Sequence, residues 1–322
     1  MLVPTEYRIN DKRTIKDLKT TSYHGFKKKD LFKLLISQIK NQNLDNANYW
    51  CAECLISGYC VNLYEKLLDF YVCEINIKNP DIICYMFLQY DKYTDLINNY
   101  DDIIESRNDQ EIRNLLCAIV SMITLSNQFQ LPKLNKINQS DITSIPRLRT
   151  TYSNYLELIS PFVKSGDAKE IILPMNEILN HLKSPKSNSL DQVIYWLSWL
   201  VSWEQEHIKK NEISCCAERA NDKLEKLYWT DMIWMLWDIL KAEAEWKGSN
   251  SLKEIIDKSY RFYVYFYNKK NRYKKIFYVI YCFLFFIKPI DFINIYGSPE
   301  NYSKILLASA NINSLYKHLE TK

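Results

Sequence analysis

Two groups of cysteine and histidine have the residue types of a zinc site. They are Cys51, Cys54 and Cys60 in the first third of the chain, and Cys215, Cys216 and His207 further on. Structural zinc sites usually hold such thiols on a turn, whereas the apolar spacing around Cys51 predicts a helix. Buried cysteine behaves as a small apolar side chain. We therefore interpret these thiols as core residues and predict that the protein binds no metal.

Catalytic and phosphate-binding motifs are the next chemistry to consider. The four histidines are far apart in the sequence, and none lies in a nucleophile elbow or a similar motif: His24, His181, His207 and His318. Residues 203–207 place two glutamates beside a histidine, a pattern typical of the solvated end of a long helix. No Walker-type or GxGxxG loop occurs among only 5 glycines. We predict a non-enzymatic protein without a cofactor.

Cations alternate with aromatic rings in residues 260–275, and a second basic run occupies residues 27–29. The basic residues concerned are Lys27, Lys28, Lys29, Arg261, Lys269, Lys270, Arg272, Lys274 and Lys275. Rings can stack on bases while cations follow the phosphates, as in single-strand binders. Alternatively, the rings continue a core helix and the cations suit its C-terminal dipole. The net charge of only +4 means that nucleic-acid binding would depend on such local patches.

Tryptophans recur at three- and four-residue steps, which places their rings on helix faces. They form two groups: Trp196, Trp199 and Trp203, and Trp229, Trp234 and Trp237. We interpret both groups as core between neighbouring helices rather than as an exposed groove. Two Tyr-Trp pairs begin amphipathic helices, and we predict that both belong to the structural core: Tyr49 with Trp50, and Tyr195 with Trp196.

The elements that must position these residues are helices. The 322 residues are 47% hydrophobic, and 5 glycines with 9 prolines supply little material for hairpin turns. We predict an all-α fold, a multi-helix bundle or irregular helical array made of two packed halves. The expected division is an N-terminal arm at 1–22, a first helical half at 23–129, a junction at 130–151 and a second helical half at 152–322.

Cysteine usage and hydropathy predict the compartment. The nine cysteines are mostly scattered through apolar runs, and no signal-peptide apolar region precedes them. We therefore expect a reducing, intracellular compartment. The apolar run at 276–287 is shorter than the ~20 residues that span a membrane. It predicts a helix buried in protein and no membrane partner.

One stretch near the N-terminus carries a resemblance. Residues 23–31 and 47–53 resemble an uncharacterised helical protein encoded by nucleocytoplasmic large DNA viruses. The Ala-x-Tyr-Trp-x-Ala pattern and the following Gly58 are also similar to the helical C-terminal domain of RarA-type replication ATPases, a relative of the clamp-loader collar. The similarity implies a collar-like helical module. The resemblance assigns no catalytic residue to this chain, and no ATPase motif is present in the sequence.

These observations lead to three hypotheses. The first is a non-enzymatic scaffold or adaptor with protein partners, belonging to a viral DNA replication or transcription assembly in the host cytoplasm or viral factory. The second is a nucleic-acid-binding protein that uses the patches at 27–29 and 261–275. The third is an enzyme whose site forms only in three dimensions.

Overall fold

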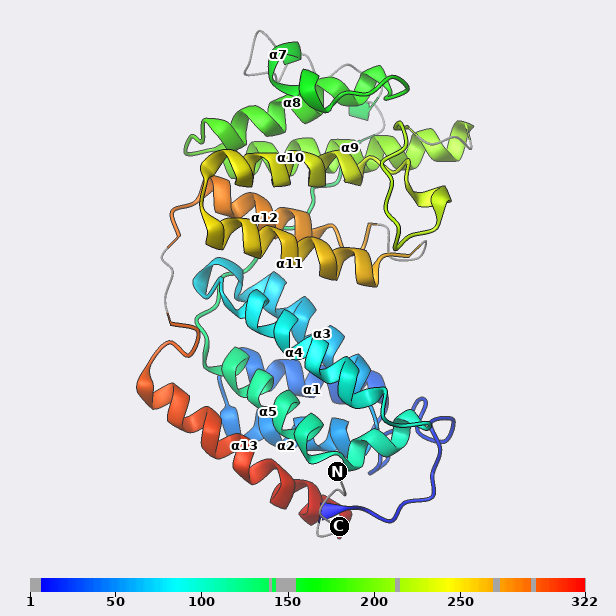
Figure 1. Ribbon diagram of the computed structural model, residues 1–322, viewed down its shortest axis with the longest axis vertical. Coiled ribbons are helices and arrows are strands. Elements are labelled where there is room, and N and C mark those ends of the chain that lie inside the picture. The colour runs from blue at the N-terminus through cyan, green and yellow to red at the C-terminus, as the bar shows by residue number, and fades with distance from the viewer. Residues whose placement is uncertain are drawn as a thin grey trace. The chain divides into compact units, whose positions relative to one another are not determined.

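The chain folds into α-helices and short 3-10 turns joined by loops (Figure 1). The computed structural model describes residues 7–138, 141–142, 155–211, 215–268, 273–290 and 294–321. Within these ranges, the only β-type pairing is an isolated antiparallel bridge between Thr21 and Lys27. The all-α prediction is confirmed.

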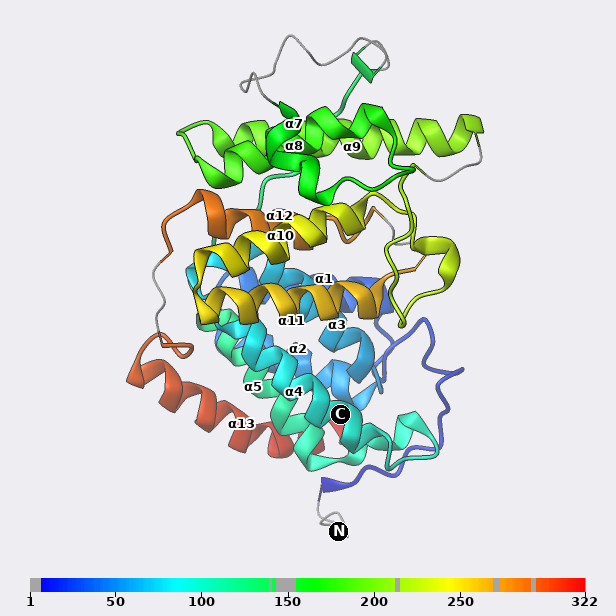
Figure 2. The ribbon, with the colours of Figure 1, turned by 45° about the horizontal axis from the view of Figure 1, so that its top comes forward.

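The helices form two compact units. Unit 1 comprises residues 1–130 and 291–322, and unit 2 comprises residues 131–290. The last helix, α13 (Pro299–Glu320), therefore belongs with the N-terminal helices, not with the second half expected at 152–322. Its apolar face packs on α2 (Leu44–Ile56) and α5 (Gln110–Leu125), as Figure 2 shows for α5. Arg113 of α5 also donates to Asn313 of α13 at 2.7 Å.

Unit 1 is built around α5, whose apolar residues are buried on several sides. The other helices of the unit, besides α2 and α13, are α1 (Lys28–Lys40), α3 (Cys60–Glu74) and α4 (Ile82–Ile97). The segment before α1 is not a detached arm. Its side chains of Ile9 and Leu18 are buried, and Asp11 is paired with the buried Arg107 at 3.1 Å.

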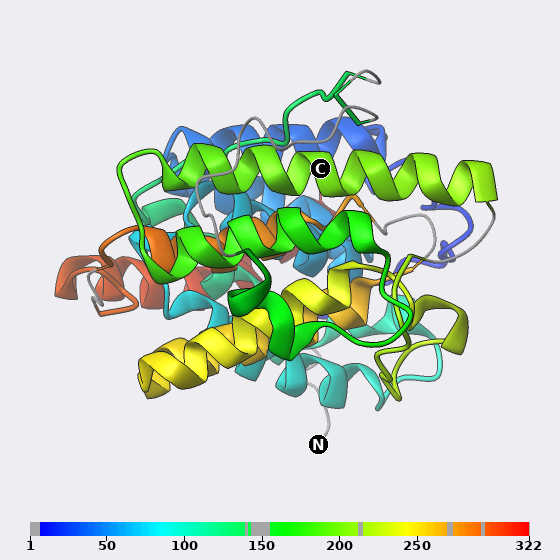
Figure 3. The ribbon, with the colours of Figure 1, turned by 90° about the horizontal axis from the view of Figure 1, so that it is seen from above.

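In unit 2, α8 and α9 lie side by side, as Figure 3 shows. The helices of this unit are α7 (Tyr155–Ile159), α8 (Lys169–Lys183), α9 (Ser189–Asn211), α10 (Ile233–Lys247), α11 (Asn250–Phe266) and α12 (Phe277–Ile287). Trp196 of α9 and Trp237 of α10 are fully buried, as the tryptophan spacing predicted.

Helix α12 is apolar on all sides, and other helices surround it. It contacts α8, α9, α10 and α11, and every residue from Tyr278 to Phe286 is buried. This is the buried helix that the run at 276–287 predicted. Across the part of the chain that the structure describes, no helix combines the length and the hydropathy needed to cross a membrane.

Candidate anion-binding site

A small hairpin before α1 gathers basic residues that are separated in the sequence. Its two sides are joined by the Thr21–Lys27 bridge and by the Ser22 N–H, which donates to the Phe26 carbonyl at 2.7 Å. Gly25 makes the turn with a φ of 85°, a conformation that suits glycine. The hairpin thus places residues 19–21 beside residues 27–29.

Glu53 of α2 holds this hairpin in place. Its side chain is fully buried and accepts a hydrogen bond from Ser22 Oγ at 2.5 Å and another from the His24 backbone N–H at 3.2 Å. The ring of His24 lies with Nδ1 2.5 Å from Glu53 Oε2 and with Nε2 2.9 Å from the Leu319 carbonyl oxygen of α13. A carbonyl oxygen only accepts, so Nε2 carries a proton. The hairpin is therefore held to both α2 and α13.

Helices α1 and α3 form the walls of the site and run parallel. Lys28 Nζ donates to Asn62 Oδ1 at 2.6 Å near their N-terminal ends, and Lys40 Nζ lies 2.6 Å from Glu74 Oε1 at their C-terminal ends. The positive ends of both helix dipoles consequently lie at the same end of the pair. That is the end where residues 27–29 lie.

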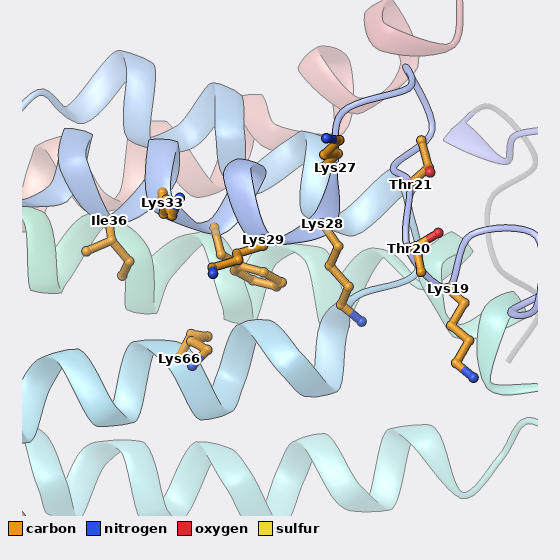
Figure 4. Close-up of a pocket in the computed structure, with 10 residues that line it drawn as sticks. Lys19, Thr20, Thr21, Lys27, Lys28, Lys29, Lys33, Ile36 and Lys66 are labelled. Atoms are coloured by element: carbon orange, nitrogen blue, oxygen red, sulfur yellow. The ribbon is translucent and has the colours of Figure 1, made fainter.

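A pocket of about 830 Å³ opens between the hairpin, α1 and α3 (Figure 4). It is lined by Lys19, Thr20, Thr21, Lys27, Lys28, Lys29, Phe32, Lys33, Ile36 and Lys66. Six of these ten residues are lysines and none is acidic. Phe32, Ile36 and the aliphatic lysine stems supply apolar surface. We call this cavity the lysine pocket.

The lysines of the pocket differ in their surroundings. Lys28 is half-buried, its ammonium lies 4.2 Å from the centre of the Tyr59 ring, and burial lowers its pKa. Lys33 is paired with Asp30 at 3.1 Å, but both side chains are more than half exposed, so the pair contributes little. Among the described residues, the other four have no ion pair; these are Lys19, Lys27, Lys29 and Lys66.

The structure thus brings the basic run at 27–29 together with three lysines that sequence reasoning missed. Lys33 had a detectable signal, because it lies four residues after Lys29 and shares its helix face. Lys19 joins only through the hairpin, and Lys66 only through the packing of α1 against α3. No local pattern indicates either of them.

The second predicted patch, 261–275, is not assembled in the same way. Arg261 is paired with Asp257 at 2.9 Å, and Lys274 is exposed. Lys275 is only 4% exposed, with its ammonium near the rings of Phe266 and Phe277, which corrects its prediction as a nucleic-acid contact. The remaining predicted cations lie outside the described residues: Lys269, Lys270 and Arg272.

Three predicted core positions also need correction. Tyr49 and Trp50 are half-buried, because the buried stripe of α2 runs through Ala47, Cys51 and Leu55 and leaves them on its flank. Tyr195 is likewise half-buried, whereas the neighbouring Trp196 is in the core.

The cysteines of the two groups lie in the protein interior. Cys51, Cys54 and Cys60 are buried, and burial raises the pKa of each thiol. Over the described ranges, no cluster of three or more His, Cys, Asp or Glu side chains has the arrangement to hold a metal ion.

Glu204 has a structural role instead of the solvent exposure predicted for 203–207. Its carboxylate is only 1% exposed, and it accepts hydrogen bonds from Cys215 Sγ at 3.1 Å and from the Met232 N–H at 2.8 Å. His207 stacks on the Trp203 ring with 4.8 Å between centroids. The hydrogen bonds of Glu204 connect α9 to the segments that follow it.

Comparisons with family models, with curated proteins and with solved structures give no match to this chain. The lysine pocket therefore has to be interpreted from its own geometry and charge.

Proposed function

We propose that this protein binds nucleic acid through the lysine pocket of unit 1, by contacts with phosphate groups. The observation that carries the proposal is the convergence of six lysines on one pocket whose lining contains no acidic side chain. Phosphate contacts by lysine release condensed counterions, which drives binding and makes it salt-dependent.

The lysines are not the only source of positive charge that supports this proposal. The N-terminal ends of the parallel helices α1 and α3 add partial positive charge at the end where residues 27–29 lie. At the opposite end of this helix pair, the Lys40–Glu74 ion pair compensates the charge. The uncompensated positive charge is therefore concentrated in the lysine pocket.

The test measures binding of a fluorescein-labelled oligonucleotide by fluorescence anisotropy over a range of salt concentrations. The variant carries Lys27→Gln, Lys29→Gln and Lys66→Gln together, which removes three charges from the pocket. Each lost phosphate contact should lower the salt slope by about 0.7 for a single strand, so the slope should fall by about 2. Affinity should fall at low salt, and the thermal unfolding midpoint should not.

The matched control removes three exposed lysines of unit 2 by Lys209→Gln, Lys210→Gln and Lys223→Gln. It changes net charge by the same amount and should retain most of the affinity and the full salt slope. A pocket variant that binds like the control would place binding elsewhere and reject the proposal.

The adaptor hypothesis has a separate observation in its favour. Tyr302, Leu306 and Leu307 are exposed on α13, and large apolar side chains gathered on a surface are typical of protein interfaces. A replication or transcription assembly is the setting that the N-terminal resemblance suggests. The test is affinity capture with the full chain and with a Leu306→Asp, Leu307→Asp variant. Partners retained equally by both would count against this surface.

A further inference from the structure

An exposed aromatic ring adjoins, in the chain, one of the lysines that line the lysine pocket. Phe26 precedes Lys27 in the hairpin, and its side chain is 38% exposed. The Trp50 ring contacts it edge to face, with 5.3 Å between centroids and an interplanar angle of 86°. Tyr49 supports Trp50 in the same way at 5.2 Å. We call Phe26 and Trp50 the ring pair.

Neither ring of the pair belongs to the fully buried core of unit 1. The buried face of α2 is formed by other residues, and Trp50 lies on the flank of that face. Phe26 sits in a hairpin that is already fixed by Glu53 and by its backbone hydrogen bonds. An exposed, supported ring on the residue that precedes a lysine of a cationic pocket matches the combination of rings and cations that single-strand binders use.

From this juxtaposition we infer that the ligand is single-stranded nucleic acid, with an unpaired base stacked on the ring pair while adjacent phosphates occupy the lysine pocket. The inference rests on the proposed function. It excludes duplex as the preferred ligand, because the bases of a duplex are stacked internally and offer no face to Phe26. Apart from lysine, the polar side chains of the pocket are Thr20 and Thr21, so the site lacks the amide and carboxylate groups that commonly read base edges. Binding should therefore be tolerant of sequence.

Three labelled probes of equal length separate the contributions of phosphates and bases. They are an oligothymidine, an abasic phosphodiester oligomer and a DNA duplex. The full-length protein should bind the oligothymidine most tightly. It should bind the abasic oligomer about 5- to 150-fold more weakly, which is the loss expected when one base no longer stacks. Equal affinity for the oligothymidine and the abasic oligomer, or preference for the duplex, would overturn the inference.

The ring itself is tested with Phe26→Ala and Phe26→Tyr. Because Phe26 is exposed, neither variant should lower the thermal unfolding midpoint substantially. Phe26→Ala should weaken oligothymidine binding to the level of the abasic oligomer, and Phe26→Tyr should restore it. The matched control is Trp246→Ala, which removes an exposed ring of unit 2 that belongs to neither proposed binding surface. It should leave all three affinities unchanged.

The two proposals fail in different ways. If the lysine pocket variant loses binding of every probe but Phe26→Ala changes nothing, phosphate binding stands and base stacking is rejected. If Lys27→Gln, Lys29→Gln and Lys66→Gln have no effect on any probe, the proposed function itself is rejected, and this inference falls with it.

Discussion

Glu53 holds the hairpin of the lysine pocket to α2, and replacing it by alanine tests this arrangement. The variant removes a fully buried carboxylate that accepts from Ser22 Oγ and the His24 N–H and pairs with the His24 ring. Alanine leaves these groups without their acceptor. It also weakens the link through His24 to the Leu319 carbonyl of α13.

The expected cost follows from burial. Removing the carboxylate leaves the Ser22 hydroxyl and the His24 backbone N–H without their acceptor, and a buried polar group left unsatisfied typically costs about 1–3 kcal/mol. The two hydrogen bonds converge on the same carboxylate, so their losses overlap and are not summed. Against a typical domain stability of about 5–15 kcal/mol, Glu53→Ala should remove a measurable part of the free energy of unfolding.

The measurement is urea unfolding followed by circular dichroism, with amide hydrogen exchange to locate the loss. Exchange should accelerate first in the hairpin at 21–27 and in the C-terminal turn of α13. The control is Glu111→Ala, which breaks an ion pair with Lys92 whose side chains are 54% and 55% exposed. An exposed pair contributes about 0–1 kcal/mol, so this variant should unfold close to the wild-type chain.

Two results would contradict this reasoning. One is a Glu53→Ala cost no larger than that of Glu111→Ala. The other is a large cost without faster exchange in the hairpin, which would show that Glu53 stabilises α2 alone. In either case the position of residues 19–29 would not depend on the buried carboxylate.

Three further predictions concern the rest of the chain. With a thiol-specific chromogenic reagent, the native protein should react at its two half-buried cysteines, and the other seven should react only after denaturation; the two are Cys73 and Cys84. Trp196→Ala should cost about 3–5 kcal/mol in thermal or urea unfolding, since its ring is fully buried, and Trp50→Ala should cost clearly less. Burial alone would raise the pKa of Asp167, but hydrogen bonds from Arg219 and two backbone N–H groups lower it below 3.8. This stabilisation is therefore present above about pH 4 and is lost as the pH falls through the lowered pKa, so the stability deficit of Asp167→Asn should shrink in acid.

Local periodicity was enough to predict the fold class and most helices. Leu31, Leu35 and Ile39 recur at four-residue steps, and this spacing alone places them on one face of α1, where all three are fully buried. Helix boundaries were less predictable. Helix α4, for example, runs from Ile82 to Ile97 without a glycine or proline to mark its end. The return of α13 to unit 1 could not be predicted, since it depends on complementary faces that are distant in sequence.

Side-chain environments were hardest to predict where polarity and burial disagree. Glu204 lies near the end of a long amphipathic helix, yet it is buried because Cys215 and the Met232 N–H supply donors. Lys275 is buried because aromatic rings accept its ammonium group. Such compensation comes from other elements and leaves no trace in the local sequence. For the same reason the position of Lys66 could not be predicted, because its place in the lysine pocket depends on α3 packing beside α1.

The lysine pocket also has a consequence for stability without ligand. Six lysines around one cavity repel each other, and its lining offers no carboxylate to offset that repulsion. The folded chain therefore carries an unfavourable electrostatic contribution there, which a bound polyanion would relieve. Ligand binding to the folded state alone should raise the unfolding midpoint. Lys27→Gln, Lys29→Gln and Lys66→Gln should leave the unliganded protein at least as stable as before and abolish this rise. A destabilised triple variant would instead assign these lysines a structural role, because lysines kept for binding should not contribute to folding in the absence of their ligand.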